Sequence, residues 1–185
     1  MNKNVLLIQF SSRKAGNCTS ISSYIQDCYS NENVCSYVVD SESMPPCGNC
    51  DYECLKAGAV CPRLTDSQKE IFDAVCNTDL ALFIVPNYCG FPCANYFAFN
   101  ERSVGYFNMN RELMQKYMSV EKHFIAVSNT ETQNFENAFM QQVNSKPSIL
   151  YLKTGKYGKR SIAGDLLDSD AAKTELQAYL DAIKL

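Results

Sequence analysis

The sequence has no long hydrophobic run and no excess of positive charge. Its longest apolar runs, such as Leu80–Val85, are far too short to span a bilayer, so we expect no membrane partner. There are 17 Lys and Arg against 20 Asp and Glu, and no basic face stands out, which argues against nucleic acid as a partner. The N-terminus lacks a signal-peptide pattern. We therefore expect a cytoplasmic protein whose thiols stay reduced.

Signatures of several enzyme classes are missing as well. His123 is the only histidine, which excludes a histidine-based triad or a multi-histidine metal site, and we expect it to be structural. No G-x-x-x-x-G-K-[ST] motif is present, which excludes a P-loop nucleotidase, and no G-x-G-x-x-G motif marks a dinucleotide site. No acidic pair ends the first apolar run, as a magnesium-binding receiver domain would require.

The sequence does contain enough apolar residues for one globular domain over residues 1–185. Hydrophobic residues make up 46%, which excludes intrinsic disorder. Five short apolar runs are nearly continuous rather than alternating, a pattern typical of strands that are covered on both faces. We predict strands at Val5–Phe10, Val34–Val39, Leu80–Val85, His123–Val127 and Ser148–Leu152.

Helical patterns separate these runs. Apolar residues recur at helical spacing, and Thr65-x-x-Gln68 is a capping-box signal. The apolar helix positions are Ile21, Tyr24, Ile25 and Cys28; Ile71, Phe72 and Val75; Leu113, Met114 and Tyr117; Phe135, Ala138 and Phe139; and Leu176, Tyr179, Leu180 and Ile183. This alternation predicts an α/β fold with a doubly wound five-stranded parallel sheet in the order 2-1-3-4-5. Ser41–Leu64 and Lys153–Ser169 are predicted to be irregular.

The loop after the first predicted strand has the composition of a phosphate site. Ser11–Thr19 combines three hydroxyl side chains, one glycine and Arg13, and it leads into a helix. In doubly wound sheets, ligands bind beyond the carboxyl ends of the strands, where the strand order reverses. Backbone amides and the helix dipole attract an anion there, and the arginine balances its charge. An ordinary strand-to-helix turn with a capped helix is the alternative.

The loop after the third predicted strand, Pro86–Pro92, offers a flat and partly apolar platform. Tyr88 and Phe91 supply aromatic area, and Gly90 permits a close approach of the backbone to a ring. The alternative is that both aromatic side chains only pack beneath the loop. After the fourth strand, a third wall is expected from Ser128, Asn129 and Thr130.

These loops resemble those of a known family. Ser11–Ser20 is similar to the S-x-R-x-x-G-N-[TS] loop of the NADPH-dependent FMN reductases, with Cys18 where the family has Thr or Ser. Pro86–Pro92 resembles the family's P-x-Y-x-x-x-P loop, which lies along the isoalloxazine ring. Phe99–Arg102 resembles a Phe-Ile-Asp-Arg-like end of a helix. The resemblance covers roughly residues 5 to 130 and implies a flavodoxin-like fold.

The resemblance also implies that FMN binds in this crevice and that NAD(P)H donates electrons. No side chain is predicted to be catalytic, because a flavin carries the hydride chemistry itself. Family members suggest a homodimer or homotetramer. The implied cofactor-binding residues are Ser11, Ser12, Arg13, Gly16, Asn17, Cys18 and Thr19; Pro86, Asn87, Tyr88, Cys89 and Gly90; and Ser128, Asn129 and Thr130.

A cysteine-rich loop at residues 41–64 is the most unusual stretch. Cys47, Cys50, Cys54 and Cys61 have the spacing C-x2-C-x3-C-x6-C, and Pro62 follows. Four thiolates on a compact loop suit a [4Fe–4S] cluster, and the related iron–sulfur flavoproteins carry a C-x2-C-x2-C motif with a fourth cysteine at this point. This sequence has one extra residue in the motif. A tetrahedral zinc site and a loop without metal are the alternatives.

Together these features predict an FMN-binding, NAD(P)H-dependent oxidoreductase that passes electrons to a small acceptor such as a quinone, a flavin or oxygen. An iron–sulfur flavoprotein that transfers electrons from ferredoxin is the second reading. A non-catalytic, flavodoxin-like module that binds zinc is the third.

Overall fold

The computed structural model describes residues 3–48, 50–56, 58–64, 67–108, 110–130 and 132–185. Its centre is a parallel sheet in the order β2-β1-β3-β5-β6, so the predicted order 2-1-3-4-5 and the flavodoxin-like fold class are confirmed. A two-residue strand, β4 (Phe91–Pro92), pairs antiparallel with β3 and was not predicted. The parallel strands are β1 (Asn4–Gln9), β2 (Asn33–Val38), β3 (Leu80–Tyr88), β5 (Glu121–Ser128) and β6 (Ser148–Lys153).

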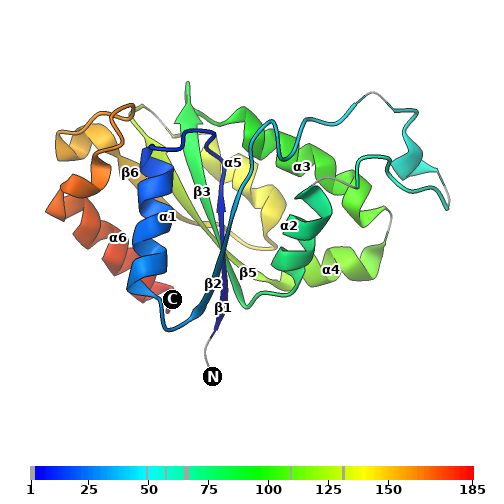
Figure 1. The fold of residues 1–185 in the computed structure, drawn as a ribbon, viewed down its shortest axis with the longest axis horizontal. Coiled ribbons are helices and arrows are strands. Elements are labelled where there is room, and N and C mark those ends of the chain that lie inside the picture. Colours follow the sequence, from blue (N-terminus) through cyan, green and yellow to red (C-terminus); the bar gives the residue numbers. More distant parts are fainter. Residues whose placement is uncertain (1–2, 49, 57, 65–66, 109, 131) are drawn as a thin grey trace.

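Helices cover both faces of the sheet (Figure 1). One face packs on α1 and α6, and the other packs on α2, α3, α4 and α5. Short 3-10 turns lie at Glu53–Leu55, Met140–Gln142, Thr154–Tyr157 and Leu166–Asp168. The helices are α1 (Asn17–Cys28), α2 (Ser67–Cys76), α3 (Ala94–Phe107), α4 (Arg111–Ser119), α5 (Phe135–Phe139) and α6 (Asp170–Ala182).

Two apolar cores lie on the two faces, because successive strand residues point in opposite directions. In β1, Leu6 and Ile8 belong to one core, whereas Val5 and Leu7 belong to the other. Most predicted helix positions face these cores. Cys28 and Met114 are exposed instead, so the apolar faces of α1 and α4 are narrower than their spacing predicts. The predicted capping box at Thr65 lies outside the described residues.

The prediction that every strand is covered on both faces is wrong for β2. In the described sheet, β2 pairs with β1 alone, and most of its side chains are exposed. Val38, for example, is 41% exposed. The strand lies at the edge of the sheet, where helices cover it less. None of the described helices has the length and apolar character needed to cross a membrane.

Candidate functional site

A crevice of about 240 Å³ opens beyond the carboxyl ends of β1 and β3. Five of its lining residues belong to the predicted phosphate loop, and three belong to the predicted platform loop. The remaining three are Val127, Ser161 and Ile162. The structure therefore brings together two loops that are some 70 residues apart in sequence, at the position that the strand order predicts.

The phosphate loop turns back on itself before α1 begins. The Thr19 hydroxyl donates to the Arg13 carbonyl at 3.0 Å, and the Arg13 backbone N–H donates to Ser11 Oγ at 3.3 Å. Gly16 is the N-cap of α1, and the first turn carries no acidic side chain. A helix N-terminus without a carboxylate attracts an anion, so the loop has the electrostatics of a phosphate site.

Two of the predicted cofactor-binding residues of this loop make contacts within the protein: Cys18 is buried, and Ser12 is bonded to α3. Cys18 is 3% exposed and packs into the core beneath the loop, and this burial raises the pKa of its thiol far above the ordinary value. Its backbone, rather than its thiol, is the part that suits an anion. Ser12 Oγ accepts a hydrogen bond from Asn95 Nδ2 at 3.2 Å, which ties the loop to the first turn of α3.

The platform loop is a tight hairpin. Tyr88 pairs with Phe91 across a two-residue turn, in which Cys89 has φ +53° and Gly90 has φ +85°. Two left-handed residues are typical of the hairpin turn whose twist matches that of the strands. Asn87 Oδ1 accepts from the Gly90 N–H at 2.8 Å, which stabilises the turn. Tyr88 and Phe91 are 58% and 50% exposed, so the hairpin presents aromatic area beside the crevice.

The residues predicted to form the third wall, Ser128–Thr130, are not among those that line the crevice. Ser128 is buried, accepts from Asn87 Nδ2 at 2.7 Å, and donates to the Thr130 carbonyl at 2.7 Å. It therefore supports the platform loop from behind. The described lining of the crevice is completed by Ser161 and Ile162 rather than by Asn129 or Thr130. These two residues lie in the stretch 153–169, which the sequence predicted only to be irregular.

The four predicted metal-binding cysteines are neighbours on the cysteine-rich loop. Cys54 and Cys61 are buried, Cys50 is half-buried and Cys47 is exposed. Burial raises the pKa of the Cys54 thiol, and the nearby thiols of Cys61, Cys47 and Cys50 raise it further. Among the described residues, however, no group of three or more His, Cys, Asp or Glu side chains is arranged to hold a metal ion.

The base of this loop is fastened to α3. Arg102 is 1% exposed, and its guanidinium donates to the carbonyls of Pro45 and Arg63, both at 2.8 Å. It also donates to Gln68 Oε1 at 2.7 Å. Pro45 precedes the first cysteine of the motif and Arg63 follows the last, so one side chain joins the two ends of the loop. The segment Phe99–Arg102, expected at the end of a helix, lies in the middle of α3.

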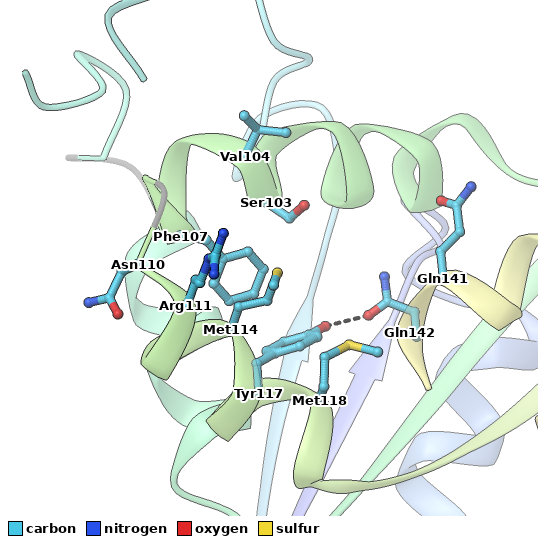
Figure 2. Close-up of a pocket in the computed structure, with 10 residues that line it drawn as sticks. All are labelled: Ser103, Val104, Phe107, Asn110, Arg111, Met114, Tyr117, Met118, Gln141 and Gln142. Atoms are coloured by element: carbon cyan, nitrogen blue, oxygen red, sulfur yellow. Dashed lines mark hydrogen bonds between the residues drawn. The ribbon is translucent and has the colours of Figure 1, made fainter. Parts of the chain in front are cut away.

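A larger cavity of about 390 Å³ lies between α3, α4 and the turn Met140–Gln142 (Figure 2). Its walls include Val104, Phe107 and Met114, and on its floor the Tyr117 hydroxyl donates to Gln142. It is mainly apolar and lies away from the loops at the strand ends. The smaller crevice is the better candidate for a charged cofactor, because it alone combines an arginine, a helix N-terminus and the switch point among the described cavities.

His123 lies at the opposite end of the sheet from the crevice, near the start of β5. Its Nε2 is 2.9 Å from Glu121 Oε1, and its ring contacts the edge of Tyr179. These contacts are those of a packing residue, as the sequence predicts.

Comparison with known proteins supports the fold. No protein-family model matches the sequence, and no curated protein matches it significantly. Solved structures do match. The Trp repressor binding protein from Bacillus subtilis has a TM-score of 0.62 at 16% identity, and the match covers 95% of this chain and 97% of that one. The flavoenzyme NAD(P)H:(acceptor) oxidoreductase FerB from Paracoccus denitrificans has a TM-score of 0.61 at 15% identity, with 98% and 97% covered.

A third match is the apo form of NADH:FMN oxidoreductase (EMOB), with a TM-score of 0.56 at 11% identity. It covers 98% of this chain and 88% of that one. At such low identities these likenesses establish a shared fold. The activity has to be argued from the residues of the crevice itself.

Proposed function

We propose that the protein is an FMN-binding, NAD(P)H-dependent oxidoreductase that passes electrons to a small acceptor such as a quinone, a flavin or oxygen. The observation that carries the proposal is the meeting of the phosphate loop and the aromatic hairpin in one crevice at the switch point. Two structural neighbours are named as an NADH:FMN oxidoreductase and an NAD(P)H:(acceptor) oxidoreductase, which agrees with this assignment.

The residues fit FMN better than FAD. The loop before α1 has one glycine and one helix N-terminus, so it suits one phosphate, and the dinucleotide glycines are missing. At about 240 Å³ the crevice is smaller than the roughly 300 Å³ typical of ligand pockets. It would enclose the phosphate and the sugar chain, and the ring would extend along Tyr88. Bound FMN would supply the electron transfer, while Asn87 and Gly90 hold the platform.

Titration of the purified protein with FMN and with FAD tests this assignment. We expect FMN to bind and its fluorescence to change, with FAD binding more weakly. The protein with FMN bound should then oxidise NADH or NADPH in the presence of a quinone. FMN binding without any oxidation of either nucleotide would favour a pure electron-transfer protein. Absence of FMN binding would overturn the proposal.

The second candidate is an iron–sulfur flavoprotein that takes electrons from ferredoxin, with Cys47, Cys50, Cys54 and Cys61 as ligands of a [4Fe–4S] cluster. Four thiols match the type and the number of ligands that such a cluster needs. The electrostatic effect of the other three thiols on Cys54 also supports the assignment, because it places them in its neighbourhood. The thiols would have to move closer together, since no three of them converge in the described structure. Zinc on the same thiols, without catalysis, is the third candidate.

Metal analysis separates these candidates. After anaerobic reconstitution, iron and acid-labile sulfide near four per chain would support the cluster. One zinc per chain would support a structural site. Iron, sulfide and zinc all near zero would leave the cysteine loop without a metal and would reject both.

We further propose that the chain forms a homodimer or homotetramer and otherwise acts on small molecules in the cytoplasm. Phe97 and Val104, seven residues apart on α3, are 45% and 50% exposed, and Val104 also lines the cavity of Figure 2. Met114, which lines the cavity of Figure 2, is 46% exposed, and Met140, at the start of the turn Met140–Gln142, is 47% exposed. Such a patch is typical of a subunit interface. Sedimentation should give at least twice the monomer mass, and Val104→Glu should reduce it.

A further inference from the structure

The segment Lys159–Leu166, here named the collar, lies directly on the phosphate loop. The carbonyls of Ser161 and Ile162 accept from the two terminal nitrogens of Arg13, each at 3.4 Å. The Ser20 hydroxyl on α1 donates to the Gly164 carbonyl at 3.4 Å. The collar comes from the connection between β6 and α6, almost 150 residues away from the loop that it contacts.

Asn17 fixes the collar at two points. This side chain is 3% exposed, its Nδ2 donates to the Ser161 carbonyl at 3.3 Å, and its Oδ1 accepts from the Leu166 N–H at 3.0 Å. A buried amide that is satisfied on both sides holds its partners firmly, because leaving either group unpaired costs about 1–3 kcal/mol. The residue predicted to touch the phosphate therefore also positions the collar.

Gly164 is the point of closest approach. Its φ is +75°, and a Cβ at this position would lie 2.6 Å from the Ala15 carbonyl oxygen in the phosphate loop. Gly158, just before the collar, has a similar φ of +66°, yet no described atom lies within 4 Å of a Cβ built there. The two glycines thus share the same backbone requirement, but only Gly164 is required for contact with the phosphate loop.

We propose that the collar is a wall of the cofactor site that aims Arg13 at the ligand phosphate and places Ile162 against the ligand. A guanidinium has five N–H groups, so the two bonds to the collar leave donors for a phosphate. Ile162 is 59% exposed and lines the same crevice as Tyr88, which gives the crevice a second apolar surface. This inference rests on the proposed function, since the ligand is the phosphate end of FMN.

The matched pair Gly164→Ala and Gly158→Ala tests the collar. Both substitutions strain a left-handed residue, so both should lower the melting temperature, and Gly164→Ala should lower it further because of its contact with Ala15. Only Gly164→Ala pushes the collar off the phosphate loop. FMN titration followed by flavin fluorescence should give at least a tenfold weaker Kd for Gly164→Ala and a change within twofold for Gly158→Ala. Equal affinities in the two variants would overturn the inference.

Limited trypsin digestion of the wild-type protein gives a second measurement that needs no variant. Arg160 is exposed in the collar, and saturating FMN should slow cleavage there severalfold while leaving cleavage at the exposed Arg111 unchanged. FMN binding without protection at Arg160 would argue against a collar wall. Failure of the wild-type protein to bind FMN would instead overturn the proposed function, and the collar's role with it.

Discussion

Cys61 lies so close to Gly105 that a Cβ at residue 105 would come within 2.9 Å of the Cys61 sulfur. The last cysteine of the motif is therefore packed against the last turn of α3 without an intervening side chain. A glycine inside a helix costs about 1 kcal/mol relative to alanine, so helix propensity alone would favour alanine at residue 105. The close contact is the physical reason for the glycine.

Gly105→Ala should therefore destabilise the protein, although alanine favours helices. We expect a loss of about 1–3 kcal/mol, because an extra methyl group in a packed contact forces its neighbours apart. Urea unfolding would measure it. In the Cys61→Ala background the sulfur is absent, and the cost of Gly105→Ala should fall by at least about 1 kcal/mol. An equal cost in both backgrounds would show that another contact is responsible.

Arg13→Ala combined with Asn17→Ala should weaken FMN binding by tenfold or more, on the order of 1.4 kcal/mol. The pair removes the cation of the phosphate loop and the amide that fixes the collar. Lys14→Ala is the matched control, because Lys14 is an exposed cation in the same loop that does not line the described crevice. Unchanged affinity in the double variant, measured by FMN titration, would mean that the phosphate binds elsewhere.

Tyr88→Ala should change the absorption spectrum or the reduction potential of bound FMN. Tyr88 is 58% exposed beside the crevice, so its loss removes aromatic area from the ring platform and costs little stability. Tyr52→Ala serves as a control, since Tyr52 is 71% exposed on the cysteine-rich loop. If the folded Tyr88 variant binds FMN with the wild-type spectrum and potential, the ring does not lie on this hairpin.

The sheet was predictable because its strands are short apolar runs between helical patterns. Runs such as Leu80–Val85 are buried on both faces, and that burial is what a continuous apolar run encodes. The same rule fails for β2, whose valines look like core residues although the strand is at the edge. The predicted order 2-1-3-4-5 does place this strand at an edge, but its apolar residues alone do not show that it is less covered than the inner strands.

The site was predictable in part, because strand order alone brings the loops at Ser11 and Pro86 together. The collar was not, because Ser161 and Ile162 hold Arg13 through their backbone carbonyls, which any residue type could supply. In the sequence, Gly164 is the one residue that could have indicated a close contact with another loop, but a glycine in an irregular stretch has many explanations. The spacing of the four cysteines predicted that they are neighbours in the fold. The directions in which their thiols point depend instead on packing contacts, such as that of Cys61 with Gly105, which the spacing does not encode.

Arg102→Met should be among the most destabilising substitutions in the protein. It would remove the guanidinium that donates to the carbonyls of Pro45 and Arg63 and to Gln68 Oε1. These three hydrogen bonds to a charged group are lost, each worth about 1–3 kcal/mol, so we expect a total of at least about 3 kcal/mol by urea unfolding. Arg111→Met, at an exposed arginine, should cost less than about 0.5 kcal/mol. A small effect for Arg102→Met would mean that other contacts close the loop.

Lys122 should make stability depend on pH in the alkaline range. Its side chain is 4% exposed, its ammonium donates to the carbonyls of Tyr117 and Val120, and burial lowers the pKa of Lys122 to about 8. The nearby Cys76 thiol opposes that shift. Between about pH 8 and the ordinary lysine pKa near 10.4, the unfolded chain binds more protons than the folded chain at this residue.

The contribution of Lys122 to stability should therefore rise with pH in this window, because the cost of a buried ammonium disappears as the folded lysine loses its proton, while buried cysteines such as Cys18 and Cys76, whose pKa burial raises, act in the opposite direction. The measurement is the free energy of unfolding in urea at pH 7.5 and pH 9.5 for the wild-type protein and for Lys122→Met. The difference in stability between the wild type and the variant should shift in favour of the wild type over this interval, because the cysteines are common to both proteins and only the wild type has the titrating lysine. Above about pH 10 both proteins should lose stability, since burial also raises the pKa of Tyr117 and the unfolded chain then loses tyrosine protons first. Identical pH dependence in the two proteins would show that Lys122 keeps an ordinary pKa in the fold.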